Sequence, residues 1–218
     1  MQKRMQALLT SQENRLFARL TTPQKIQQYL DTLSINFETA GETYMSPRRV
    51  MREKRAHCFE GALFAAAALF YHGLKPLLLD FQTLPSDEDH VVALFRQHGR
   101  WGAISKTNHT ILRYRDPVYE TVRELAMSYF HEYFLSGGRK SMVAYSAPFD
   151  VSKHKLKRWL TVEEDLDWLV EALDKSRHFP IAPKKNMRML RNVTPVELEI
   201  LSITEWSKKR RQKRSYGK

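Results

Sequence analysis

The chain has 218 residues, of which 42% are hydrophobic and 11% are aromatic, and its formal net charge is +12. This composition supplies enough apolar side chains for a packed core and excludes an intrinsically disordered chain. The single cysteine excludes an intramolecular disulfide and is typical of a reducing compartment, so we expect a cytoplasmic protein.

The positive charge is concentrated near one end of the sequence. Seven basic residues and no acidic residue lie between Lys208 and Lys218, so residues 1–207 carry only +5. We expect a single domain over residues 1–206 and a basic, disordered tail over residues 207–218. The longest apolar run, residues 61–71, is shorter than the roughly 20 residues that span a bilayer, which predicts no membrane contact.

The first part of the chain is predicted to be helical. Apolar residues recur on one side of residues 2–20, which predicts a first helix. Thr22 before Pro23 and Ser46 before Pro47 are each a capping residue followed by proline, a pair typical of a helix N-terminus. We therefore expect two further helices to begin at these prolines.

The most apolar stretch of the chain begins at Cys58 and ends at Tyr71. It contains four consecutive alanines and is apolar on all sides, so it predicts a buried central helix rather than a strand or a surface helix. His72 and Gly73 follow it and are typical of a helix end.

Three short strands are predicted after this helix. Residues 76–81 form the first, and residues 90–96 and 100–105 form a hairpin around His98 and Gly99. Helices, then strands, then more helices is an order typical of an α+β fold. We expect the central helix to pack on a small antiparallel sheet.

Three more helices are predicted in the second half of the chain. Each begins at a capping residue: Asp116 before Pro117, Thr161 with Glu164, and Thr194 with Glu197. The first is expected to run through Phe134 and the last toward Trp206, whereas residues 141–160 are expected to be irregular.

Cys58 is the candidate nucleophile. A thiol becomes reactive when its anion is stabilised, which a helix N-terminus and a neighbouring histidine both achieve. Cys58 is the first residue of the predicted central helix, and His90 begins a predicted strand, so a strand laid against the helix start would bring imidazole to sulfur. The structural interpretation competes, because a lone cysteine in an alanine-rich helix is commonly a small core residue.

Three segments resemble the transglutaminase-like superfamily, a group of papain-like Cys–His hydrolases and acyltransferases. They are Arg55-Ala56-His57-Cys58-Phe59-Glu60-Gly61-Ala62 and Asp89-His90-Val91-Val92-Ala93-Leu94-Phe95, followed by Gly99-Arg100-Trp101-Gly102-Ala103-Ile104. The resemblance spans residues 45–118. It implies that Cys58 is the nucleophile, that His90 is its base, and that no cofactor is required.

The third member of the family's catalytic set departs from the pattern. The family has an aspartate on the strand after the histidine, and Ser105 occupies that position here. Serine supplies no carboxylate, although it can accept a hydrogen bond from imidazole. Asp116 is a more distant candidate, because we expect it to cap a helix. Trp101 is expected either to border the substrate cleft or to be a core tryptophan.

The pairing of the predicted hairpin ranks the residues that could orient His90. With residues 98–99 as the loop, His90 pairs with Thr107, and Ser105 is a diagonal neighbour. One extra loop residue would instead place Asn108 opposite His90. Since asparagine orients the imidazole in papain-like proteases, we favour Asn108, with Ser105 second.

The sequence therefore predicts a cysteine-dependent hydrolase or acyltransferase that acts on the amide of a peptide, a protein or a small molecule. One alternative is a non-catalytic binding module of the same fold, which the missing carboxylate favours. Another is weak nucleic-acid binding through the basic tail, which salt would weaken steeply. No metal site is expected, because the sequence has no Cys-x-x-Cys and no second histidine four residues after His131.

Overall fold

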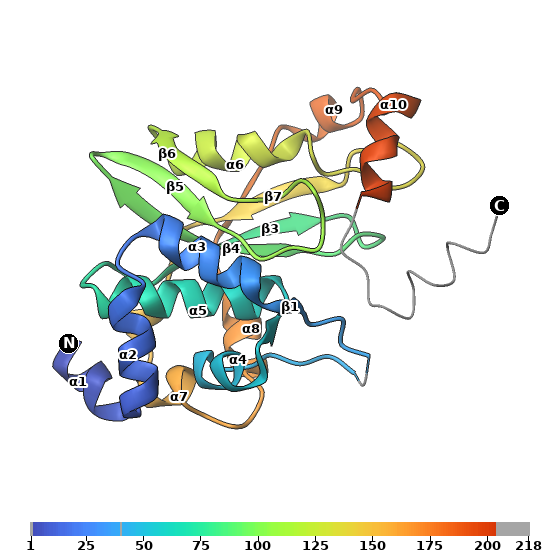
Figure 1. Cartoon of the computed structure of the whole chain (residues 1–218). Coiled ribbons are helices and arrows are strands. Elements are labelled where there is room, and N and C mark those ends of the chain that lie inside the picture. Colours follow the sequence, from blue (N-terminus) through green and yellow to red (C-terminus); the bar gives the residue numbers. More distant parts are fainter. Residues whose placement is uncertain (1, 40, 204–218) are drawn as a thin grey trace.

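The computed structural model describes residues 2–39 and 41–203, and its central feature is an antiparallel sheet with helices on both faces (Figure 1). The strands of this sheet are β3 (Leu77–Thr83), β4 (His90–Gln97), β5 (Arg100–Ile104), β6 (Arg115–Tyr119), β7 (Met142–Ser146), β8 (Phe149–Asp150) and β9 (His178–Pro180). They lie in the order β6-β5-β4-β3-β7-β9, and β8 also pairs with β3. The predicted α+β fold is confirmed, although the sheet is larger than expected.

Helix α5 (Cys58–Tyr71) fills one face of the sheet, and both of its predicted ends are confirmed. Every residue from Phe59 to Phe70 is buried, so the helix is a core element, as its uniform apolarity predicted. The other elements on this face are α1 (Gln2–Leu8), α2 (Ser11–Arg19), α3 (Pro23–Thr32), α4 (Pro47–Glu53), α7 (Lys157–Leu160), α8 (Asp167–Asp174) and the short parallel pair β1 (Ser34–Ile35) and β2 (Arg55–Ala56) (Figure 1).

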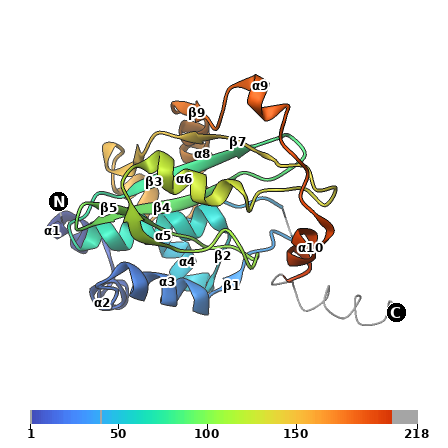
Figure 2. The same cartoon turned by 90° about the horizontal axis from the view of Figure 1, so that it is seen from above.

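Helix α6 (Val122–Phe130) covers the opposite face. Seen from above, α5 runs beneath β3 and β4, whereas α6 lies over β5 and β6 (Figure 2). Residues 91, 93 and 95 of β4 pack with α5, and residues 92 and 94 pack with α6. Because both faces of β4 are buried, this strand is apolar throughout instead of alternating.

The remaining short elements follow α8 or lie just before α7. They are the 3-10 turns η1 (Val151–Lys153) and η2 (Glu199–Ser202) and the helices α9 (Lys184–Met187) and α10 (Pro195–Leu198). The predicted capping box of Thr194 with Glu197 does begin α10. The helix predicted to run toward Trp206 is α-helical only to Leu198 and is followed by η2, and residues 204–206 and the basic tail lie outside the described residues. In the part of the chain that the structure describes, no helix has the length and apolarity needed to cross a membrane.

The predicted single helix over residues 2–20 is wrong, because the segment forms two helices, α1 and α2. The chain breaks between α1 and α2, where the Thr10 side chain accepts a hydrogen bond from Glu13 N and Glu13 Oε2 accepts one from Thr10 N at 2.7 Å. This capping box starts a new helix. The apolar periodicity hid the break because Met5 and Phe17, on the two helices, are both buried in the same core.

The predicted long helix from Asp116 through Phe134 is also wrong. Its first residues form the edge strand β6, where Pro117 is tolerated because it need not donate a ladder hydrogen bond. The helix begins only after Thr121, whose hydroxyl accepts a hydrogen bond from Glu124 N at 3.0 Å. Thr121 is thus the actual helix cap.

Two further predictions fail between residues 141 and 166. The stretch expected to be irregular contains β7, which pairs with β3 and β9. Thr161 and Glu164 do not form a capping box, and α8 begins later, at Asp167. Asp165 instead accepts hydrogen bonds from Tyr44 N and from Arg49, so this acidic segment binds another part of the chain.

The hairpin of β4 and β5 has the predicted two-residue turn. Gln97 pairs with Arg100, and His98 and Gly99 have φ values of 46° and 81°, as a type I′ turn requires. Strand β4 therefore starts where β5 ends, and both points lie at the edge of the sheet where α5 begins. This register sets the position of His90.

The chain just after β5 passes very close to the first turn of α5. A Cβ built on Gly61 would overlap the Cβ of Lys106. Lys106 is buried, and its Nζ donates a hydrogen bond to Leu33 O at 2.6 Å. Glycine at position 61 is therefore what allows this segment to lie against the helix.

We expect Gly61→Ala to destabilise the fold by about 1–3 kcal/mol, because overpacking outweighs the better helix propensity of alanine. The matched control is Gly137→Ala, where an added Cβ meets nothing within 4 Å. Urea unfolding should show a lower midpoint for the first variant and a nearly unchanged one for the second. Equal midpoints would contradict the close approach.

Candidate active site

Cys58 borders a cavity at the edge of the sheet. The residue is half-buried and is the first residue of α5. The cavity has a volume of about 750 Å³, and its wall consists of residues 35–38, 57–58, 85–90, 106–109, 111–112, 132–134 and Leu201. The cysteine therefore lies at an accessible helix N-terminus and not within the apolar core.

The first strand residue of β4, His90, carries an imidazole that borders the same cavity. Its Nε2 lies 2.8 Å from Ser105 Oγ, and Ser105 Oγ donates to Leu112 O at 2.6 Å. Because the serine proton is given to that carbonyl, Ser105 Oγ accepts from Nε2–H. The other ring nitrogen, Nδ1, is then free to accept a proton, and the nearby His90 ring lowers the pKa of the Cys58 thiol.

Ser105 is itself fixed by a side chain from a distant part of the sequence. Gln27 on α3 donates from Nε2 to Ser105 O at 2.8 Å and accepts from Ser105 N at 3.0 Å. These two bonds hold the backbone of residue 105 where β5 ends. Ser105 is 2% exposed, so its bond to His90 is shielded from water.

The structure does not bring Asn108 to His90. Within the described chain, Ser105 is the hydrogen-bond partner of His90 Nε2, because the two-residue turn leaves out the extra residue that Asn108 required. Asn108 still borders the cavity. Asp116 lies exposed on the edge strand β6.

Trp101 is not a wall of the Cys58 cavity. It lies next to the hairpin turn, four residues before Ser105, which corresponds to about 13 Å along a strand. There it packs beneath the guanidinium of Arg96, 5.6 Å from the ring centroid, and borders a separate groove. Substrate contact by Trp101 at Cys58 is therefore not supported.

A second imidazole, which sequence reasoning left without a role, lies beside the sulfur. His57 Nδ1 is 3.9 Å from Cys58 Sγ, and His57 Nε2 is 2.7 Å from Thr43 O. His57 is the N-cap residue of α5. The available sequence signal was its position immediately before the cysteine, at the predicted start of the helix.

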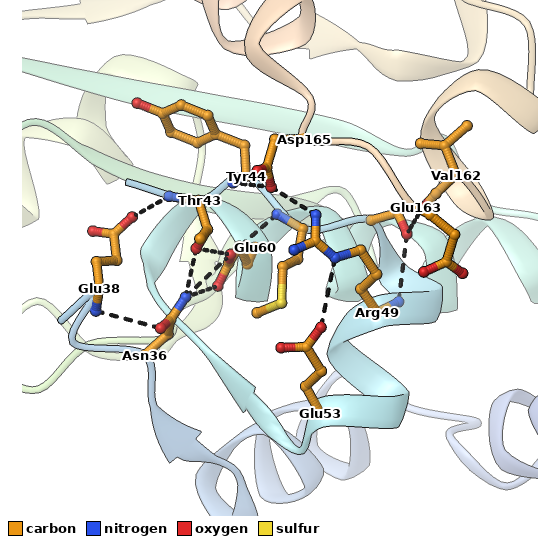
Figure 3. A network of polar contacts seen from close by, with 12 residues as sticks. Asn36, Glu38, Thr43, Tyr44, Arg49, Glu53, Glu60, Val162, Glu163 and Asp165 are labelled. Carbon is orange, nitrogen blue, oxygen red and sulfur yellow. Dashed lines mark hydrogen bonds and ion pairs between the residues drawn. The ribbon is translucent and has the colours of Figure 1, made fainter. Parts of the chain in front are cut away.

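A buried carboxylate organises the loop around this histidine. Glu60 is fully buried and accepts hydrogen bonds from Thr43 Oγ1 at 3.0 Å, from Met45 N at 3.0 Å and from His57 N at 2.9 Å. Asn36 Nδ2 donates to both of its oxygens (Figure 3). One glutamate thus joins the segment that follows β1 to the first turn of α5.

The two imidazoles make the thiol unusually acidic. Burial alone would raise the pKa of Cys58, but hydrogen bonds from His57 and His90 outweigh it and lower the pKa to about 6. Burial likewise opposes charge on His57, but Cys58, Glu60 and the Thr43 carbonyl raise its pKa to about 9. At neutral pH the sulfur is therefore a thiolate beside an imidazolium.

Within residues 2–39 and 41–203, no group of three or more histidine, cysteine, aspartate or glutamate side chains is arranged to hold a metal ion. The chemistry that these residues themselves provide is that of an ionised sulfur nucleophile.

No protein-family model matches the chain, and no curated protein matches it in sequence. Among solved structures, the fold is similar to LapG of Legionella pneumophila in an EGTA-treated form. The sequence identity is 13% and the TM-score is 0.39, and the match covers 79% of this chain and 95% of LapG. So distant a similarity carries no functional inference, and the roles proposed below rest on the site itself.

We expect alkylation of Cys58 by iodoacetamide to rise with pH around a midpoint near 6, because the folded environment lowers the pKa of the thiol to about 6. An ordinary thiol has a pKa of about 8.5. The rate should therefore be nearly constant from pH 7 to 8, whereas the urea-denatured chain should still gain rate in that interval. A native midpoint near 8.5 would contradict the ion pair.

Proposed function

We propose that the protein is a cysteine-dependent hydrolase or acyltransferase that acts on amide or related acyl bonds. Cys58 is the nucleophile and His90 is the general base and acid. The observation that carries the proposal is a half-buried thiol with a lowered pKa at the first residue of a 14-residue helix, hydrogen-bonded to an imidazole and bordering a cavity.

The reaction proceeds through an acyl-enzyme. The Cys58 thiolate attacks the substrate carbonyl, and a carbon–sulfur bond forms as the carbonyl electron pair moves to oxygen. The first backbone N–H groups of α5 have no partner within the helix and stabilise this oxyanion. When the electron pair returns, the bond to the leaving group breaks, and His90 Nδ1 passes to the departing amine the proton that it took up when Cys58 ionised.

Water or an amine then completes the cycle. His90 Nδ1 removes a proton from the incoming nucleophile, which attacks the thioester and releases Cys58. Ser105 keeps the other ring nitrogen protonated by accepting its hydrogen bond, so Nδ1 remains the basic atom. Hydrolysis and acyl transfer differ only in which nucleophile enters the cavity.

The charge of the cavity wall restricts the substrate. Among the described residues that border the cavity, five carry carboxylates and one carries an ammonium group. They are Glu38, Asp87, Glu88, Asp89 and Glu132, together with Lys106. This balance favours a neutral or cationic peptide, protein side chain or small amide over an anionic one.

A non-catalytic binding module remains the second candidate. The observation that favours it is the serine behind His90, where a carboxylate would strengthen the base. Nucleic-acid association through residues 207–218 stays a separate prediction, because these residues lie outside the described chain.

We expect the protein to release p-nitrophenolate from p-nitrophenyl acetate in a burst equal to one acetyl group per Cys58. Cys58→Ala should abolish the burst, because no other residue is proposed to form the acyl-enzyme. A burst that persists in this variant, or an intact protein with no burst and no acetylated Cys58 by mass spectrometry, would favour the binding module.

We expect Ser105→Ala to slow this acylation and its turnover by about 3- to 10-fold, because losing a hydrogen bond of about 0.5–1.5 kcal/mol frees the His90 ring to rotate. Asn108→Ala is the matched control and should stay within about twofold of the wild type. The opposite ranking of the two variants would return the orienting role to Asn108.

A further inference from the structure

We propose that the two imidazoles beside Cys58 have separate roles: His57, supported by Glu60, holds the sulfur as a thiolate, and His90 carries the protons of the reaction. This inference rests on the proposed function, because it divides one catalytic task between two residues. It assigns His57 and Glu60 as positioning residues of the reaction.

The contacts of His57 favour the doubly protonated ring. On one side, Nδ1 faces Cys58 Sγ at 3.9 Å, and on the other side Nε2 faces Thr43 O at 2.7 Å. The Thr43 carbonyl accepts a hydrogen bond from Nε2–H, and a thiolate at Cys58 can only accept one from Nδ1–H. Opposite an ionised Cys58, the imidazolium is therefore the one form of the ring that donates to both neighbours.

Negative charge next to His57 stabilises that imidazolium further. Its Nε2 lies 3.4 Å from Glu60 Oε1 and 3.7 Å from Glu38 Oε1. The Glu60 carboxylate cannot turn away, because it is fully buried and held by the hydrogen bonds of the surrounding loop (Figure 3). The ring itself is held against Phe59, with 6.5 Å between the ring centroids.

The surroundings of His90 are different in charge. Nε2 meets the uncharged hydroxyl of Ser105, and the ring stacks on Phe81 at 6.5 Å between centroids. Among the described residues, no carboxylate lies within ion-pair distance of His90. The hydrogen-bond partner of the His90 ring is therefore an uncharged hydroxyl, whereas the His57 ring lies beside a carboxylate.

The titratable groups that face the two rings can be compared directly. Around His57 they are Cys58, Glu60, Glu38 and Tyr44, and around His90 they are Cys58 and His109. His57 therefore has two carboxylates and His90 has a second imidazole. The family resemblance implies a carboxylate next to the histidine base, but here His90 has Ser105, and the carboxylate of Glu60 lies next to His57 instead.

The test compares His57→Gln, His90→Gln and Glu60→Gln by the pH dependence of thiolate ultraviolet absorbance, each corrected with Cys58→Ala. We expect His57→Gln to move the thiol midpoint from about 6 toward the ordinary value of about 8.5 and to slow alkylation at pH 7 by at least tenfold. Glu60→Gln should shift the midpoint in the same direction by a smaller amount, because its amide keeps some of the loop hydrogen bonds.

His90→Gln should behave in the opposite way. Its thiol midpoint should stay within about one pH unit of the wild type, and alkylation should remain fast. Acyl transfer should nevertheless fail at the second step, so that p-nitrophenyl acetate leaves acetylated Cys58 that mass spectrometry detects and that water does not release. Near-ultraviolet circular dichroism establishes whether each variant is folded. If His57→Gln does not fold, the midpoint of Glu60→Gln provides the test of the role of His57.

The possible outcomes separate this inference from the proposed function. A wild-type midpoint near 8.5 would overturn both. A wild-type midpoint near 6 that His57→Gln and Glu60→Gln leave unchanged would overturn only the role of His57. Equal shifts in His57→Gln and His90→Gln would also overturn it, since the two rings would then share one role.

Discussion

The buried carboxylate of Glu60 is the interaction on which the geometry of the site depends. A carboxylate in a protein interior is strongly unfavourable unless hydrogen bonds replace its hydration, and the Asn36–Met45 segment together with the first turn of α5 supplies them. Satisfying one charge therefore fixes the loop, the helix start and the ring of His57 together. The surroundings of Cys58 Sγ therefore depend on the hydrogen bonds that Glu60 accepts, because these bonds hold His57 beside it.

The sheet provides the second half of the site through its register. A two-residue turn leaves no freedom in the pairing of β4 with β5, so the start of one strand and the end of the other meet beside α5. This register brings the His90 side chain to Ser105, and Gln27 holds the backbone of residue 105 there. The antiparallel hairpin thus positions the imidazole of His90, and the buried loop positions that of His57, so the two rings beside Cys58 come from different elements.

Much of this arrangement follows from local sequence. The all-apolar run after Cys58, the His98-Gly99 turn and the helix starts at Pro23 and Pro47 each have one strong local solution, and the structure shows it. The misplaced elements depend on distant contacts. Residues 115–119 become a strand because β5 offers them an edge, and Gln27 reaches Ser105 across 78 residues. The periodicity of the sequence does not reveal such pairings, and for the same reason it does not reveal the contact of His57 with Thr43.

The Gln27–Ser105 contact shows that the candidate site depends on residues from the N-terminal helices. The segment of residues 45–118 contains Cys58 and both histidines, yet it lacks the Gln27 amide that is hydrogen-bonded to residue 105 and the Leu33 carbonyl that accepts from Lys106. A fragment limited to residues 45–118 would keep Cys58, His57 and His90. It would lose the contacts of Gln27 and Leu33 that hold residues 105 and 106 in place beside His90. The N-terminal helical segment therefore supports the end of the hairpin, although it contributes no candidate reactive group itself.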